Sequence, residues 1–333
     1  MNKIGITTTV PIEIVYCAGL IPIDLNNIFV TAENNARYIE VAEKEGFPKS
    51  MCAWIKGLYG VCMEHQINEL IGVIEGDCSN SKSLIELWKQ KGKKIYPFSF
   101  PYSQKKKELE KSLSDLMEQL QVDLDQVEEK RKELNQIRRL VQEIDRLTFE
   151  EEKVTGFENH LYQVSCSDFQ GDPKSFAVML QSVLDEMKSR TANPKKLRLG
   201  YIGVPPMTID IYDYVETLDA RIIYNEVQRE FTFPRAGNAV SIIDQYLDYT
   251  YPYGNLYRIE EIKKQIEKRK LDGIIHYTQA FCHRALDDIM IKSNIDIPIL
   301  NIEGDQSPAL DARTKLRIEA FIDMLSDLKG VYQ

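Results

Sequence analysis

One local arrangement occurs twice in this chain, once in each half. A short apolar run ends at a turn that contains a cysteine, and a helix-like stretch and a second apolar run follow. The first copy spans 71–98 around Cys78, and the second spans 272–300 around Cys282. Strands that alternate with helices predict parallel β-sheets. Because ligands of open α/β sheets bind beyond the carboxyl ends of strands, two facing domains with these cysteines would share a metal site.

The length of 333 residues suggests two domains. We therefore predict an α/β fold with two doubly wound, Rossmann-like parallel-sheet domains and a long inserted helical segment. The predicted boundaries are a first α/β domain at 1–103, a helical insertion at 104–153, a helical connection at 154–192 and a second α/β domain at 193–333.

Two helical segments stand out in this pattern. Residues 51–70 predict one long helix, in which Gly57 and Gly60 indicate close packing against a neighbour. The insertion at 104–153 contains no glycine or proline, and its apolar residues recur at steps of three and four. Such spacing is typical of a long helix or helical hairpin packed along a narrow seam. Two interpretations stay open: an arm that lies on its own domain, and an arm for docking or dimerisation.

Charge and composition exclude several classes of function. The formal net charge is −9 and no basic stripe is present, so a nucleic-acid partner is not expected. No stretch approaches the ~18 apolar residues of a membrane span, and the opening residues lack the apolar core of a signal peptide. We therefore expect a cytoplasmic protein whose cysteines are thiols rather than disulfides.

The candidate ligands are the six cysteines. Neither a Walker A motif nor a Gly-x-Gly-x-x-Gly motif is present, and no Cys-x-x-Cys pair exists. Soft thiolates select iron–sulfur clusters, zinc or copper(I), but an unmodified cysteine also serves as a small buried apolar residue. The interpretation as a small buried residue suits the cysteines in apolar runs best. A predicted helix start near Cys52 favours a thiolate there. The full set is Cys17, Cys52, Cys62, Cys78, Cys166 and Cys282.

Three further residues are candidates for proton transfer. His283 adjoins Cys282, where it could donate a hydrogen bond to a cluster or a proton to a substrate. Glu75 and Glu303 each begin a Glu-Gly-Asp sequence, and carboxylates at strand ends can act as acid or base. The alternatives are a structural histidine and carboxylates that cap the following helices.

Several short motifs together resemble one known superfamily. They include Glu-Gly-Asp-Cys-Ser-Asn at 75–80 and Gln-Ala-Phe-Cys at 279–282, and the others lie at 5–13, 18–27, 51–57, 229–231 and 302–305. This set is similar to the 2-hydroxyacyl-CoA dehydratase/benzoyl-CoA reductase superfamily. The resemblance covers most of the chain outside 104–153.

The resemblance implies an iron–sulfur cofactor. In that superfamily three cysteines of a subunit hold a four-iron cubane whose remaining iron stays open, and the matching residues here are Cys52, Cys78 and Cys282. The three further cysteines depart from this pattern and resemble double-cubane cluster proteins, in which six thiolates hold eight irons and nine sulfides. By that count Cys17 and Cys166, with Cys62, hold the second cubane. Cys62 fits this least well, because ten residues of helix separate it from Cys52 by about 15 Å.

The implied function is an anaerobic iron–sulfur reductase. It would receive low-potential electrons from a separate ATP-hydrolysing iron–sulfur activator protein and reduce a small-molecule substrate at the double-cubane cluster. We expect a homodimer, because the proteins that the chain resembles usually pair and the implied activator is itself two-fold. The alternatives are a 2-hydroxyacyl-CoA dehydratase subunit with a single [4Fe–4S] cubane, a non-catalytic cluster carrier or activator-binding scaffold, and a metal-free α/β protein.

Overall fold

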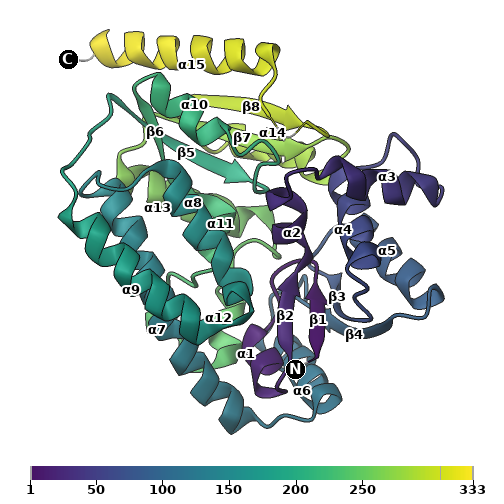
Figure 1. Ribbon diagram of the computed structural model, residues 1–333. Helices are drawn as coiled ribbons and strands as arrows, with labels where there is room; N and C mark the ends of the chain where they lie inside the picture. Colours follow the sequence, from purple (N-terminus) through teal and green to yellow (C-terminus); the bar gives the residue numbers. More distant parts are fainter. Residues whose placement is uncertain (1, 308, 332–333) are drawn as a thin grey trace. The chain divides into compact units, whose positions relative to one another are not determined.

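The computed structural model describes residues 2–307 and 309–331. The chain divides into two compact units, and neither is one continuous stretch of sequence (Figure 1). The first unit comprises Met1–Arg139, Val164–Val178 and Glu230–Gly254, and the second comprises Leu140–Gln163, Met179–Arg229 and Asn255–Gln333. Each unit contains a four-stranded sheet with all strands parallel, so the predicted α/β class with two Rossmann-like sheets is confirmed.

The sheet of the first unit has the strand order β2-β1-β3-β4. Its strands are β1 (Lys3–Ile6), β2 (Ile21–Asp24), β3 (Glu69–Glu75) and β4 (Lys94–Ser99). Parallel strands need right-handed crossovers, and the chain moves from β1 to β2 in one direction and from β2 past β1 to β3 and β4 in the other. The crossover helix between β1 and β2 therefore lies on the opposite face from those that precede and follow β3.

The helices of the first unit form two layers on these faces. Helix α1 packs with α6 on one face, and α4 packs with α3 and α5 on the other. The bounds are α1 (Ile12–Cys17), α2 (Leu25–Thr31), α3 (Ala36–Lys44), α4 (Ala53–Glu64), α5 (Ser79–Gln90), α6 (Lys106–Leu120) and α12 (Ile242–Leu247), with short 3₁₀ turns η1 (Ser165–Ser167), η2 (Phe169–Gly171) and η3 (Ala236–Asn238).

Helix α4 shows what the sequence predicted well and what it did not. A Cβ atom added at Gly60 would lie 2.1 Å from the carbonyl oxygen of Tyr38, so the expected close packing is confirmed. The helix does not continue to residue 70, however. It ends at Glu64, and Gln66 follows in a left-handed conformation with φ 53°. A left-handed residue ends the helical hydrogen-bond pattern, which frees the chain to begin β3.

The predicted helical segment at 104–153 is a pair of helices. Helix α6 ends at Leu120, Gln121 follows in a left-handed conformation with φ 57°, and α7 (Leu124–Phe149) comes next. The apolar residues Leu109, Leu113 and Leu116 of α6 are buried, and the helix contacts β4, α1 and α12 of its own unit. For α6, these contacts favour the interpretation that the segment lies on its own domain over a docking or dimerisation arm.

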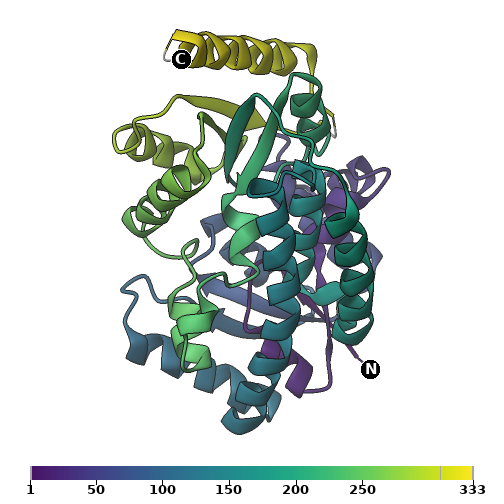
Figure 2. The ribbon, with the colours of Figure 1, turned by 90° about the vertical axis from the view of Figure 1, so that its left-hand side faces the viewer.

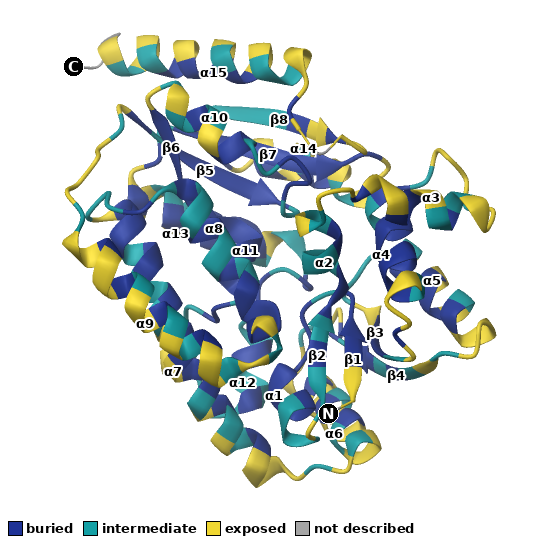
Figure 3. Ribbon diagram, in the orientation of Figure 1, coloured by how far each residue is buried: buried dark blue, intermediate teal, exposed yellow. Residues whose placement is uncertain are grey.

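The sheet of the second unit repeats the same order, as β6-β5-β7-β8. Helices α10 and α15 lie on one face of this sheet, and α13 and α14 lie on the other (Figure 2). Each face packs against its helices through an apolar core. Strands β6 and β7 are buried along their whole length (Figure 3). The strands are β5 (Leu197–Gly203), β6 (Ala220–Asn225), β7 (Gly273–Gln279) and β8 (Ile299–Gly304).

The helices of the second unit complete the two layers. Helix α7 and three further helices cross the division between the units. The bounds are α10 (Ile211–Thr217), α13 (Asn255–Arg269), η4 (His283–Leu286), α14 (Asp287–Lys292) and α15 (Ala312–Val331), with α8 (Gly156–Val164), α9 (Pro173–Ser189) and α11 (Glu226–Glu230) at the division. Within the described ranges, no helix has the length and apolar character needed to cross a membrane.

Candidate metal centre

Cys52, Cys78 and Cys282 occupy the same kind of position. Each is the residue directly before a helix, at the starts of α4, α5 and η4. Cys78 lies three residues beyond the end of β3, and Cys282 lies three residues beyond the end of β7. In both sheets this is the third strand in chain order, so the predicted strand–Cys–helix–strand repeat is confirmed. The strand order reverses beside β3 and β7, and ligands of such sheets bind at the carboxyl ends there.

The start of α5 surrounds Cys78 with hydrogen-bond donors. The backbone N–H of Ser81 donates to the Cys78 sulfur at 3.4 Å, and the Ser81 hydroxyl lies 3.3 Å from it. Burial and the nearby Asp77 raise the pKa of the Cys78 thiol, although the Ser81 hydrogen bonds act in the opposite direction. A bound metal ion removes the thiol proton and so reverses this balance.

The turn before Cys282 is closed by backbone hydrogen bonds. The Cys282 N–H donates to the Gln279 carbonyl at 2.9 Å, and the Gln279 side chain donates to the Asp305 carbonyl at 3.0 Å. Cys282 is therefore fixed to the ends of both β7 and β8.

A chain of buried charges fixes the segment that follows Cys282. Arg258 of α13 donates to Asp287 at 2.8 Å and to Glu226 at 2.6 Å, and Arg284 also donates to Asp287 at 3.1 Å. Burial acts to raise the pKa of Glu226, but Arg258 outweighs it and holds that pKa below its usual range. Glu226 also accepts the Gly203 N–H at the end of β5, so these ion pairs connect the Cys282 segment to the sheet.

Cys62 lies at the other end of β3. Its side chain is fully buried, and its sulfur donates to the Ile67 carbonyl at 3.6 Å, two residues before β3 begins. The seven residues of β3 separate this point from the Cys78 turn by roughly 20 Å. Burial raises the pKa of the Cys62 thiol to about 12. In this structure Cys62 is a core residue.

Cys17 and Cys166 lie near α1. Cys17 ends α1 and donates to the Gln126 carbonyl at 3.3 Å, and burial raises its pKa to about 11. Cys166 is buried, and burial raises its pKa to about 12 against the opposing effect of Arg138, which binds Glu13 of α1 at 2.6 Å. The sheet thus separates Cys17 from α4. Among the described residues, no three His, Cys, Asp or Glu side chains gather into a metal-binding group.

The three predicted proton-transfer residues lie in different environments. Glu75 ends β3, and its carboxylate accepts the Tyr102 N–H at 2.8 Å, which holds the chain after β4. Glu303 is exposed on β8, the fourth strand of its sheet, so the two Glu-Gly-Asp sequences do not occupy equivalent positions. His283 is the exposed first residue of η4, and partial burial and Arg284 lower its pKa.

A buried carboxyl pair in the first unit was not predicted. The Asp24 N–H at the end of β2 donates to the Asp168 carboxylate at 3.0 Å, and burial together with Asp24 raises the pKa of Asp168 to about 7. Asn26 donates to Asp24 at 2.7 Å and accepts from Trp54, two residues after Cys52. Asp24 lies in one of the family-like motifs, but nothing in the sequence connects it to a residue 144 positions away.

These features define a class of protein with two parallel α/β sheets and a cysteine beyond the third strand of each. The family model described as 2-hydroxyglutaryl-CoA dehydratase, D-component, matches residues 7–325. The chain therefore belongs to this family, and the predicted superfamily is confirmed. No curated protein matches the sequence.

Proposed function

We propose that this chain is the iron–sulfur component of a two-component dehydratase system, in which Cys52, Cys78 and Cys282 hold a single four-iron cubane. One observation supports this most strongly. The three cysteines that resemble the superfamily's ligands are also the three that precede helices, and the remaining three cysteines of the chain do not share that position. Their donor set fits the cofactor, since soft thiolates favour iron–sulfur clusters and helix N-termini favour thiolates.

When bound, the cubane would supply one-electron chemistry at an iron open to substrate. The chain's own groups would hold and tune it, because hydrogen bonds to sulfur, such as those from Ser81 to Cys78, help to set the reduction potential. His283 is the proposed proton-transfer residue because it is exposed beside Cys282. Glu303 is a weaker candidate on the fourth strand, and Glu75 is weaker still because its carboxylate already accepts the Tyr102 amide.

The proposed reaction removes water from a 2-hydroxyacyl-CoA thioester. The bond between C2 and the hydroxyl oxygen breaks, C3 loses a proton, and a C2–C3 double bond forms. Substrate and products differ only by water, so an electron supplied by the activator is returned at the end of the cycle. The activator would be a separate ATP-hydrolysing iron–sulfur protein, in keeping with the absence of a Walker A motif here.

The double-cubane reductase is the second candidate, and the count of six cysteines favours it. It needs Cys17, Cys62 and Cys166 on one cubane. Their placement does not favour this arrangement, because Cys62 is on the α4 side of the sheet and Cys17 is at the end of α1. That cluster would require Cys62 to leave its buried position in α4.

Iron and acid-labile sulfide per chain test both candidates. Anaerobically purified protein should contain about four irons, and Cys78→Ser should lose most of them, because one of the thiolates that hold the cubane is gone. Cys62→Ala is the matched control and should keep its iron. About eight irons, with a loss in Cys62→Ala, would establish the double cubane instead. Iron-free protein after anaerobic reconstitution would overturn both candidates.

Two partner predictions belong to the same proposal. An ATP-hydrolysing activator with ATP should reduce the cluster without any substrate, which is measured as bleaching of the cluster's visible absorption. Sedimentation equilibrium should give the mass of a homodimer. Failure of every such activator to bleach an intact cluster would contradict the two-component assignment.

A further inference from the structure

Phe281 occupies a turn position that suits glycine. It is the third residue of the turn from Gln279 to Cys282, which the Cys282 N–H closes at 2.9 Å from the Gln279 carbonyl. Its φ is 64°, in the left-handed region. Turns with a positive φ at the third residue favour glycine or asparagine there, because a residue with a Cβ atom is strained in this conformation.

The side chain of Phe281 does not offset this strain by packing. It is 64% exposed, although it follows a strand whose seven residues are all buried. The turn itself is well held, because the Ala280 N–H donates to the Gly304 carbonyl and the Gln279 side chain donates to the Asp305 carbonyl. Phe281 therefore combines a strained backbone with an exposed aromatic ring, two features that folding alone disfavours. Positions of this kind are characteristic of functional sites.

The location of Phe281 indicates which function. It directly precedes Cys282, beyond the carboxyl end of β7, where ligands of such sheets bind. The nearest cation in the sequence, Arg284, has a side chain that is only 13% exposed and is paired with Asp287 at 3.1 Å. This segment therefore presents an apolar ring beside the cysteine, while its arginine charge is already compensated.

We propose that Phe281 contacts the acyl group of the substrate, and that the chain selects a 2-hydroxyacyl-CoA with an apolar acyl chain over one that ends in a second carboxylate. This inference rests on the proposed function. An aromatic ring gains from contact with an apolar chain, whereas a carboxylate placed against it loses hydration without a compensating partner.

A matched pair of thioesters tests the proposal. 2-Hydroxypentanoyl-CoA and 2-hydroxyglutaryl-CoA have the same five-carbon chain and differ in a terminal methyl or carboxylate. The wild-type protein, with its cluster and activator, should prefer the pentanoyl thioester by at least about tenfold in kcat/KM. Phe281→Gly should remove most of this preference by raising KM for the pentanoyl thioester about tenfold. It should also raise the Tm slightly, because glycine adopts a positive φ without strain.

Ile289→Ala is the control, since Ile289 of α14 is 67% exposed on the same segment. It should leave both KM values unchanged. A wild-type preference for the glutaryl thioester, or an unchanged preference in Phe281→Gly, would overturn the inference. So would slower activator-driven reduction in both variants with unchanged KM values, because that outcome assigns the exposed apolar residues to protein docking.

Cluster content and activator-driven bleaching are measured without substrate, so they report on the proposed function separately. If both succeed and Phe281→Gly behaves as wild type, only the substrate inference fails. If no cluster forms, or neither thioester turns over, the proposed function fails and this inference falls with it.

Discussion

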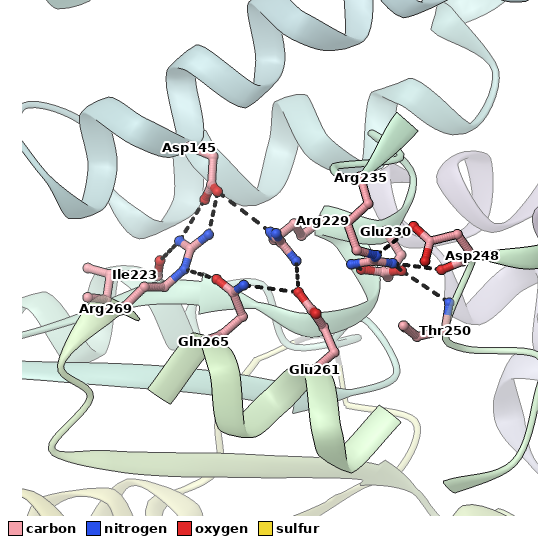
Figure 4. Close-up of polar contacts among 10 residues, drawn as sticks. All are labelled: Asp145, Ile223, Arg229, Glu230, Arg235, Asp248, Thr250, Glu261, Gln265 and Arg269. Carbon is pink, nitrogen blue, oxygen red and sulfur yellow. Dashed lines mark hydrogen bonds and ion pairs between the residues drawn. The ribbon is translucent and has the colours of Figure 1, made fainter. Parts of the chain in front are cut away.

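Asp145→Asn should strongly destabilise the second unit. Asp145 of α7 accepts hydrogen bonds from Arg269 and, at 3.0 Å, from Asn159 (Figure 4). Arg229 lies 3.9 Å away and binds Glu261 at 2.9 Å. The network drawn to the right in Figure 4, around Glu230 and Arg235, belongs to the first unit and is not perturbed by this substitution.

The expected magnitude follows from burial. The side chains of Asp145 and Arg269 are 10% and 1% exposed. Asparagine keeps the size of the side chain but removes its charge, which leaves the Arg269 guanidinium buried with the Gln265 side chain and the Ile223 carbonyl. Breaking a buried ion pair from one side costs about 3–5 kcal/mol.

Low pH should reduce the stability of the wild-type protein because it protonates the Asp145 carboxylate. Burial acts to raise the pKa of Asp145, but Arg269 outweighs it and holds that pKa below its usual range. The stabilisation is therefore present above the unfolded pKa near 4 and is lost as pH falls through the lower folded value.

The neighbouring Glu143 provides a control on the same helix. It binds Arg146 at 2.8 Å, and the two side chains are 31% and 36% exposed, so Glu143→Gln should cost less than about 1 kcal/mol. Urea unfolding at pH 7, followed by far-ultraviolet circular dichroism, compares the variants. Trp54 and Trp88 are the two tryptophans and both lie in the first unit, so their fluorescence reports on that unit. Equal midpoints for Asp145→Asn and Glu143→Gln would refute the reasoning.

Three further predictions concern the first unit. Burial and Asp24 raise the pKa of Asp168 to about 7, above its unfolded value. The stabilisation from the protonated carboxyl is therefore fully present below about pH 4 and is lost as pH rises through 7. The urea midpoint from tryptophan fluorescence should fall between pH 5 and 8, and a flat or rising midpoint contradicts this. Gly60→Ala should lower the free energy of unfolding by about 1–3 kcal/mol, because the new Cβ atom would lie 2.1 Å from the Tyr38 carbonyl oxygen. An unchanged Tm would show that α3 and α4 can move apart without loss of stability. Cys62→Ala should cost about 1 kcal/mol by the same unfolding assay, since it removes one buried atom, and a larger loss would indicate a ligand.

Local sequence patterns predicted the strands and helices of both sheets, because periodicity and turn residues act over a few positions. They were less accurate at the ends of these elements. Helix α4 ends early at a left-handed Gln66, and β8 begins at Ile299 and continues to Gly304, beyond the predicted end at residue 300. Nor could they show that the first unit includes Glu230–Gly254, since contacts between distant segments leave no periodic signal.

The candidate site was predictable in the same limited sense. The placement of Cys78 and Cys282 after strands follows from local pattern alone, and Cys52 before a helix was expected. The pairing of Asp24 with Asp168 depends on tertiary packing. The conformation of Phe281 was hidden for a different reason, because phenylalanine is a residue type that rarely adopts a positive φ, and the sequence therefore argues against what the turn requires.

The shared strand order also supports the proposed set of three thiolates over a set of six. In each unit one helix directly precedes the third strand and another directly follows it, which gives four corresponding helix starts at α4, α5, α13 and η4. Three of them follow a cysteine, whereas α13 begins at Asn255 with no cysteine nearby. In the proposed cubane of four irons, thiolates at three of these positions would leave one iron without a protein ligand. The asymmetry between α4 and α13 therefore suits the open iron of the proposed cubane, which would need no contribution from the buried Cys62.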